Sequence, residues 1–183
     1  MKRYLISAAC IALAVCLCAC GKPKAADPED YGYTITQQEN GTYTLQVEAN
    51  DGSALYVRER LAEEPQCLAL TEDTLQIVGN HDSGTQWAVF CDVTEDRVSD
   101  AVANYVTAND TKVAYVDYLT DAYHLFVRDI YDETLYLEAV TLTGLVVQED
   151  GSLVTDAKLK GGKLTVTYYT TAGKANAIID MPE

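Results

Sequence analysis

The stretch from residue 112 to residue 133, KVAYVDYLTDAYHLFVRDIYDE, decides the fold class of this chain. Two runs rich in Val, Tyr and Leu stand on either side of a short polar break. β-Branched and aromatic residues favour pleated, half-buried strands over helices. We therefore expect an antiparallel hairpin here, made of one strand, a turn, and a second strand that contains LFVRD.

Three further runs alternate between apolar and polar residues. They are TYTLQVEA (42–49), TQWAVFCDV (85–93) and KLTVTYY (163–169). A period of two places one set of side chains on a buried face and the other set in solvent, so each run predicts a strand. Turn signals rich in Gly, Asn and Asp separate the runs, at residues 50–52, 80–84, 149–151 and 161–162.

A short internal repeat points to a recurring hairpin. The stretches ALYVRER (54–60) and HLFVRDI (124–130) agree at nearly every position. We aligned the predicted hairpins on an acidic residue near the end of the second strand of each hairpin. This alignment gives four units, near 41–60, 74–93, 111–130 and 162–181. The aligned acids are Glu59, Asp92, Asp129 and Asp180.

The stretch 112–133 resembles a β-propeller blade, in which one strand, a turn and an LFVRD-like strand recur. Closed propellers use blades of four strands and typically four or more blades. Units spaced by 33, 37 and 51 residues leave little room for four full blades. We therefore expect an all-β domain of antiparallel hairpin repeats, propeller-like and either complete or incomplete, with a two-sheet β-sandwich as the alternative.

The stretch RVSDAVANYV (97–106) departs from the alternating pattern. Its apolar residues Val98, Ala101, Val102 and Tyr105 have helical spacing. This stretch predicts either one or two turns of helix or an irregular strand.

The first thirty residues have the character of an export signal. Lys2 and Arg3 precede an apolar run from Tyr4 to Ala19, and a polar stretch follows. A basic start, a short apolar core and a small residue at the cut are typical of a secretory signal. Because a spanning helix needs about 20 apolar residues, a permanent transmembrane segment is the weaker interpretation.

The end of this run, Leu17-Cys18-Ala19-Cys20, resembles the lipobox of bacterial lipoproteins. That resemblance implies cleavage by signal peptidase II between Ala19 and Cys20, and a diacylglyceryl group on the Cys20 sulfur. It divides the chain into a signal peptide at 1–19, the lipidated Cys20 with a flexible polar tether up to residue 32, and an all-β domain at 33–183. The region 92–133 also resembles uncharacterised extracytoplasmic lipoproteins of Gram-positive bacteria.

The cysteines allow two other interpretations. The C-x-C-x-C spacing of Cys16, Cys18 and Cys20 is compatible with a metal or redox cluster, but these residues lie in an apolar run without neighbouring His, Asp or Glu. Cleavage as a plain secretory signal is also open. In the remaining chain, Cys67 and Cys91 either form a disulfide or stay free, and we favour free thiols in separate strands.

The chain that remains after residue 19 is strongly acidic. It contains 11 basic and 28 acidic residues, a net charge of −17. Such a charge argues against binding nucleic acid or anionic lipid headgroups through electrostatic attraction. Membrane contact is therefore expected through the N-terminal lipid, and the expected further partner is an envelope protein or a glycan.

The sequence offers few residues with a catalytic pattern. His81 lies in the turn NHDSG beside Asp82 and Ser83, where sequence neighbours do not give the geometry of a triad. His124 begins a strand. We expect no catalytic residue, cofactor or bound metal, although a pair of carboxylates leaves no mark in sequence.

The four aligned acids suggest one possible ion site. If the units stack, Glu59, Asp92, Asp129 and Asp180 could cluster on one rim and bind a cation. The simpler interpretation is that each acid ends a strand at a turn, where Asp is common. The sequence thus favours a lipid-anchored protein on the extracytoplasmic face of the cell membrane, with a non-enzymatic binding or scaffolding role. A small carboxylate-dependent hydrolase of wall or glycan material is the alternative.

Overall fold

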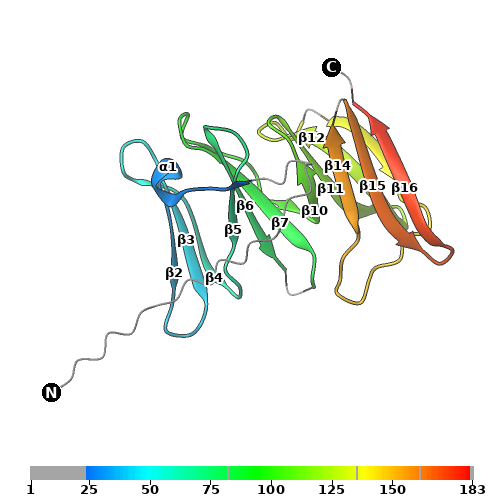
Figure 1. Cartoon of the computed structure of the whole chain (residues 1–183), viewed down its shortest axis with the longest axis horizontal. Coiled ribbons are helices and arrows are strands. Elements are labelled where there is room, and N and C mark those ends of the chain that lie inside the picture. Colours follow the sequence, from blue (N-terminus) through cyan, green and yellow to red (C-terminus); the bar gives the residue numbers. More distant parts are fainter. Residues whose placement is uncertain (1–23, 82, 135, 161, 182–183) are drawn as a thin grey trace.

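The computed structural model describes residues 24–181 apart from 82, 135 and 161, and within this part the chain forms four antiparallel sheets. The sheets follow one another in chain order along a row (Figure 1). The first contains β2 (Tyr33–Gln37), β3 (Tyr43–Glu48) and β4 (Ala54–Leu61). The second contains β1 (Lys24–Ala25), β5 (Gln66–Ala69), β6 (Thr74–Asn80), β7 (Gln86–Asp92), β8 (Arg97–Val98) and β9 (Val102–Ala103).

The other two sheets complete the row. The third contains β10 (Tyr105–Ala108), β11 (Lys112–Leu119), β12 (Ala122–Asp129) and β13 (Tyr136–Thr141). The fourth contains β14 (Asp156–Lys160), β15 (Lys163–Thr170) and β16 (Gly173–Asp180). The prediction of an all-β domain of antiparallel hairpins is therefore confirmed, and the described sheets form an open row rather than a closed ring (Figure 1).

The four predicted hairpin units are confirmed as β3–β4, β6–β7, β11–β12 and β15–β16. In three of them the predicted acid pairs with the first strand at its start: Thr74 with Asp92, Lys112 with Asp129, and Lys163 with Asp180. The first unit differs, because two register shifts interrupt the pairing of β3 with β4. There Tyr43 pairs with Leu61, beyond Glu59.

Three apolar cores lie between the four sheets. The first core joins the first and second sheets, the next joins the second and third, and the last joins the third and fourth. The second and third sheets therefore bury both faces, whereas the first and fourth bury one. This explains the sequences, because β7 (QWAVFCD) is almost continuously apolar, whereas β15 (KLTVTYYT) alternates.

The folded part begins earlier in the chain than the sequence suggests. Residues 24–32 were expected within a flexible tether, but β1 pairs with β5 and the Ala26 N–H donates to the Cys67 carbonyl at 3.0 Å. The short helix α1 (Pro28–Tyr31) is capped by Asp27, and the buried Tyr31 donates a hydrogen bond to the Thr71 carbonyl. Burial also raises the pKa of Tyr31. Residues 24–32, which the predicted boundary at residue 33 placed in the tether, therefore pack with the β domain.

The stretch 97–106 is irregular strand, so its helical alternative is wrong. β8 and β9 both pair with β7 in the second sheet, whereas β10 belongs to the third. Asn104 has a φ of 49° between β9 and β10, where the chain passes from one sheet to the next. The apolar spacing in this stretch arises because it contacts two sheets in turn. Within the described ranges, no helix is long and apolar enough to cross a membrane.

Candidate functional site

The four predicted acids occupy corresponding places in the repeat. Asp92, Asp129 and Asp180 are the last residues of β7, β12 and β16. Glu59 lies inside β4, which continues to Leu61. The repeat therefore placed three of the four acids at strand ends.

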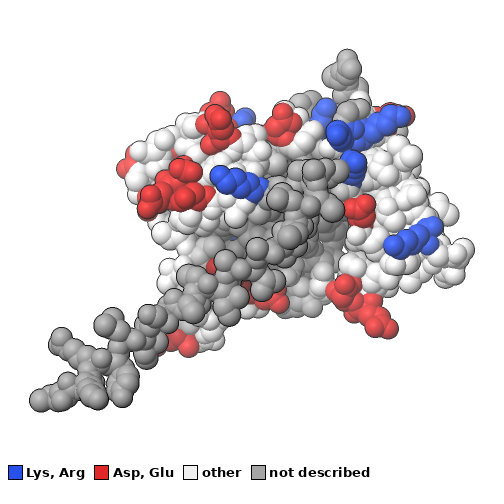
Figure 2. Space-filling model, viewed as in Figure 1, with Lys and Arg blue, Asp and Glu red and all other residues white. Residues whose placement is uncertain are grey.

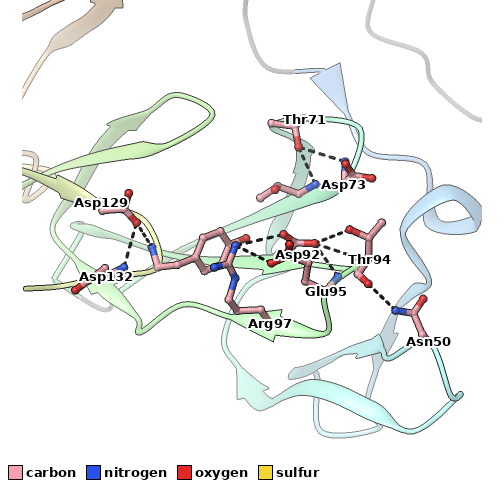
Figure 3. A network of polar contacts seen from close by, with 11 residues as sticks. Asn50, Thr71, Asp73, Asp92, Thr94, Glu95, Arg97, Asp129 and Asp132 are labelled. Atoms are coloured by element: carbon pink, nitrogen blue, oxygen red, sulfur yellow. Dashed lines mark hydrogen bonds and ion pairs between the residues drawn. The ribbon is translucent and has the colours of Figure 1, made fainter. Parts of the chain in front are cut away.

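Two of these acids hold the turns that follow their strands. The Asp92 Oδ1 accepts hydrogen bonds from the backbone N–H groups of Thr94 at 3.2 Å and Glu95 at 3.0 Å. The Asp129 Oδ1 accepts from the corresponding groups of Tyr131 at 2.8 Å and Asp132 at 3.1 Å. Figure 3 shows both arrangements. An Asp that bonds the backbone two and three residues ahead stabilises a turn, so the structural interpretation accounts for these two acids.

The cation beside Asp92 is an arginine side chain of the same sheet. The Arg97 guanidinium lies 3.5 Å from the Asp92 carboxylate and 3.2 Å from Glu95 (Figure 3). Its central carbon lies 3.9 Å from the centroid of the Tyr131 ring, in the loop after β12. Burial alone would raise the Asp92 pKa, but hydrogen bonds from Glu95 and Thr94 and the charge of Arg97 hold that pKa below its ordinary value. Arg97 thus supplies the positive charge beside the Asp92 carboxylate.

The remaining two acids lie in other surroundings. Asp180 forms an exposed ion pair with Lys163 at 3.0 Å. Glu59 lines an open hollow on the first sheet together with Thr44 and Arg60. Across the described part of the chain, no group of three or more His, Cys, Asp or Glu side chains could hold a metal ion. The structure does not bring the four acids together into a cation site.

The cysteines and histidines that stood out in the sequence have structural positions. Cys67 and Cys91 are buried free thiols on β5 and β7, with β6 between them, which confirms the prediction of free thiols. Burial raises the pKa of each to about 12, so both thiols are protonated and unreactive at neutral pH. The His124 Nδ1 lies 3.3 Å from the Thr141 hydroxyl, and His81 is exposed in the turn after β6. Ala19 and Cys20 lie outside the described residues.

A cavity of about 350 Å³ opens at the junction of the second, third and fourth sheets. It lies at the β6–β7 turn, at the opposite end of that hairpin from Asp92. Its lining combines residues that carry amides, hydroxyls and carboxylates with apolar residues, and its polar surface is only slightly larger than its apolar surface. The lining includes Gln86, Asn104, Asp150, Ser152 and Asp156.

Two turns of the same type meet at one wall of this cavity. In each, a glycine with φ near +80° donates its N–H to the carbonyl three residues earlier, from Gly84 to His81 and from Gly151 to Gln148. A Cβ on Gly84 would collide with the Asp150 carbonyl, and a Cβ on Gly151 would collide with the Ser83 carbonyl. The two turns therefore touch backbone to backbone, which requires glycine at both positions.

The cavity presents hydrogen-bond acceptors and donors close together. Hydrogen bonds from the Ser152 hydroxyl and backbone N–H hold the pKa of Asp150 below its ordinary value. The Asp150 carboxylate is therefore ionised at neutral pH and accepts hydrogen bonds. The amides of Gln86 and Asn104 each offer both donors and an acceptor. This set suits a polar ligand that carries several hydroxyl groups.

Sequence reasoning did not find this cavity. Its walls come from the turn at 81–85 and the loop at 148–157, more than sixty residues apart in the chain. The signal present was the pair of turn motifs HDSGT and QEDGS, each ending in Gly followed by Thr or Ser. Each motif predicts its own turn but carries no information that the two turns touch.

No protein-family model matches the chain, and no curated protein matches its sequence significantly.

Proposed function

We propose that this chain is a lipid-anchored binding protein on the extracytoplasmic face of the cell membrane, and that its cavity binds a hydroxyl-rich ligand such as a wall saccharide. The lipobox-like residues Leu17 to Cys20 support the location at the membrane. The cavity at the junction of three sheets supports the activity. In this proposal the lipid on Cys20 provides the membrane contact, and the β domain provides the ligand contact.

The observation that carries the proposal is the polar lining of the cavity. A volume of about 350 Å³ lies within the range of small-molecule sites, which is about 300 to 1,000 Å³. Most such sites are chiefly apolar, whereas this one offers amides from Asn104 and Gln86 and carboxylates from Asp150 and Asp156. Leu153 and Val154 add a small apolar surface, which suits the C–H face of a sugar ring.

The second candidate is a hydrolase that uses Asp150 and Asp156, which both line the cavity. A glycosidase pair needs one carboxyl group whose pKa is raised, so that it can protonate the leaving oxygen. The pKa of Asp150 is lowered instead, through its hydrogen bonds from Ser152. Asp150 therefore does not suit the role of this acid, and a hydrolase would need Asp156 in that role.

Calorimetric titration of the detergent-solubilised full chain with peptidoglycan oligosaccharides tests the cavity. We expect saturable binding, and a loss of affinity of about tenfold or more in Gln86→Ala and in Asp156→Ala, because each change removes hydrogen bonds worth about 1.4 kcal/mol. Asp110→Ala, on an exposed turn away from the cavity, is the matched control and should bind normally. Equal affinities in all variants would place the ligand elsewhere, and shortened oligosaccharides would favour the hydrolase.

Cell fractionation tests the proposed membrane localisation separately. We expect the full chain in the membrane fraction and the Cys20→Ser variant in the soluble extracytoplasmic fraction. The reason is that two acyl chains provide stable anchoring at about 0.8 kcal/mol per buried CH₂ group, whereas the variant has no sulfur to carry them. Mass spectrometry of an N-terminus without lipid would contradict the proposal.

A further inference from the structure

Charge is divided unevenly along the row of sheets. Residues 24–150 contain 6 basic and 25 acidic residues, a net charge of −19. Residues 156–180, which form the fourth sheet, contain four lysines and two aspartates. Figure 2 shows most of the blue side chains of the visible face over this fourth sheet, whereas red side chains predominate over the first and second sheets. The acidic protein therefore has one basic end.

All four lysines lie on the outer face of the fourth sheet. Leu164, Val166 and Tyr168 of β15 point into the last core, so Lys163 and Thr165 point outward. The strand register places the remaining lysines beside them on the same side. We call this surface the lysine face and define it by Lys158, Lys160, Lys163, Thr165, Lys174 and Ile178. Asp156 and Asp180 lie on the same side, opposite Thr167 and Lys163 in the register, and Asp180 forms an ion pair with Lys163. This side therefore carries four basic and two acidic side chains, a net charge of +2. Ile178 is 59% exposed, the highest value among the large apolar side chains described.

The opposite end of the row carries a different outer face. Leu45 and Val47 of β3 are fully buried in the first core, so the residues between and beside them point away from it. The register places Val57 beside Gln46, and Val57 is 46% exposed. We call this surface the glutamate face and define it by Thr36, Thr44, Gln46, Glu48, Val57 and Glu59. The hollow lined by Glu39, Thr44, Glu59 and Arg60 belongs to this face, so one basic side chain lies among its acids.

These two end faces lack the contact that every interior face of the row has. Each interior face packs against the next sheet, whereas none of the described sheets covers the lysine face or the glutamate face (Figure 1). Each of them carries an exposed β-branched residue, and they carry opposite charges. We propose that the lysine face of one copy of this chain stacks on the glutamate face of a second copy, so that the row of sheets continues from molecule to molecule.

The geometry determines the kind of assembly. The two faces differ and lie at opposite ends of the row, so the contact is heterologous and head-to-tail. Every copy keeps one free face after binding, and association continues as an open row rather than stopping at a dimer. Ile178 and Val57 become covered, and the lysines face Glu48 and Glu59. The contact lies outside the cavity except at Asp156, which lines the cavity and lies on the same side of β14 as Lys158.

The size of the faces sets the strength of the contact. Three strands spaced about 4.8 Å apart and up to eight residues long give a face of about 400 Å². Stable complexes bury about 800 Å² on each partner, so the contact is weak and forms at high protein concentration. Charge pairing then decides which faces meet, because like-charged faces repel at short range.

Sedimentation velocity of the full chain in detergent, over a wide range of protein concentration, tests the proposal. We expect the weight-average sedimentation coefficient to rise steadily with concentration and without a plateau at the dimer. The double variant Lys160→Glu/Lys174→Glu makes the lysine face acidic, and Glu48→Lys/Glu59→Lys makes the glutamate face basic. Each double variant alone should lose association at least tenfold, whereas a mixture of the two should associate again.

The mixture distinguishes the proposal from damage to the fold. In the mixture every reversed face meets a reversed partner and every native face meets a native partner, so complementarity returns only if these two faces touch. Lys24→Glu, which reverses an exposed charge on β1, is the matched control and should associate as the native chain does. A native chain that stays monomeric at all concentrations, or a mixture that fails to associate, would overturn the proposal. So would a monomeric chain whose lysine face binds phosphatidylglycerol vesicles, which would assign that face to anionic lipid.

Discussion

β4 of the first sheet and β12 of the third sheet have nearly the same sequence but lie in different surroundings. In β4 the sequence is ALYVRER, and in β12 it is HLFVRD followed by Ile130. The corresponding valines show the difference, because Val127 is fully buried and Val57 is 46% exposed. β12 lies between two cores, whereas β4 belongs to the end of the row.

This comparison separates two kinds of information. The local pattern of apolar, β-branched and aromatic residues determines that both stretches form the second strand of a hairpin. The position of the sheet in the row determines how deeply each residue is buried. Corresponding residues should therefore respond very differently to the same substitution, and three changes test this from the largest expected effect to the smallest.

The first change removes corresponding leucines. Leu125 is fully buried in the core between the third and fourth sheets, so Leu125→Ala should lower the free energy of unfolding by about 2 to 5 kcal/mol. Leu55 is partly buried at the edge of the first core, so Leu55→Ala should cost about 1 kcal/mol. Urea denaturation of both variants measures the difference. Similar costs would show that the end sheet is packed as tightly as the interior one.

The second change compares acids at corresponding positions. Asp92→Ala should lower the free energy of unfolding by about 1 to 2 kcal/mol, because it leaves two backbone N–H groups without their acceptor and removes one of the two carboxylates beside Arg97. Glu59→Ala should have little effect, because Glu59 is exposed and does not end its strand. Both costs are measured by urea denaturation at neutral pH.

The Asp92 contribution should also depend on pH. Its pKa in the folded chain lies below the ordinary value of 3.8, so the folded state favours the ionised carboxylate. The stabilisation is therefore fully present above the unfolded-state pKa and is lost as the pH falls through the folded-state pKa. The difference in stability between the native chain and Asp92→Asn should shrink toward acid pH. A difference that stays constant down to pH 3 would show that the carboxylate charge is not involved.

Much of the hairpin architecture could be predicted from sequence, because each hairpin is determined by residues close together in the chain. Alternation in KLTVTYY and the turn residues around Gly162 are sufficient for β15 and its neighbours. The segment from Lys24 to Gly32 was misassigned because two buried residues, Ala26 and Tyr31, give no detectable period. Its order depends on β5, which follows more than thirty residues later.

The candidate site and the end faces depend on contacts between units, which alternation within one unit does not encode. The backbone contact of Gly84 with Asp150 forms one wall of the cavity, yet each glycine alone predicts no more than its own turn. The net charge of the whole chain is strongly negative, so it likewise gives no indication that the fourth sheet is basic. The outer position of its lysines became clear once the side chains of Leu164 and Val166 were assigned to the core.

The third and smallest change concerns the arginines of the repeated strand. Arg58 points inward from β4, and its guanidinium carbon lies 3.8 Å from the centroid of the Trp87 ring on β7. Arg58→Gln should lower the free energy of unfolding by about 0.5 to 1 kcal/mol, the range for a cation–π contact that is partly exposed. Because Trp87 is the single tryptophan of the chain, its emission reports the loss directly.

Arg60→Gln is the matched control for this change, since it removes the same charge from the same strand on an exposed residue. Its tryptophan emission and stability should remain close to those of the native chain. In the third sheet the corresponding Arg128 instead donates to the backbone carbonyls of Asp129 at 3.0 Å and Ile130 at 3.4 Å. Arg58 therefore links the first sheet to the second, whereas the corresponding Arg128 stabilises a turn within the third sheet. An unchanged Trp87 emission in Arg58→Gln would show that the contact between Arg58 and Trp87 does not help to join the first and second sheets.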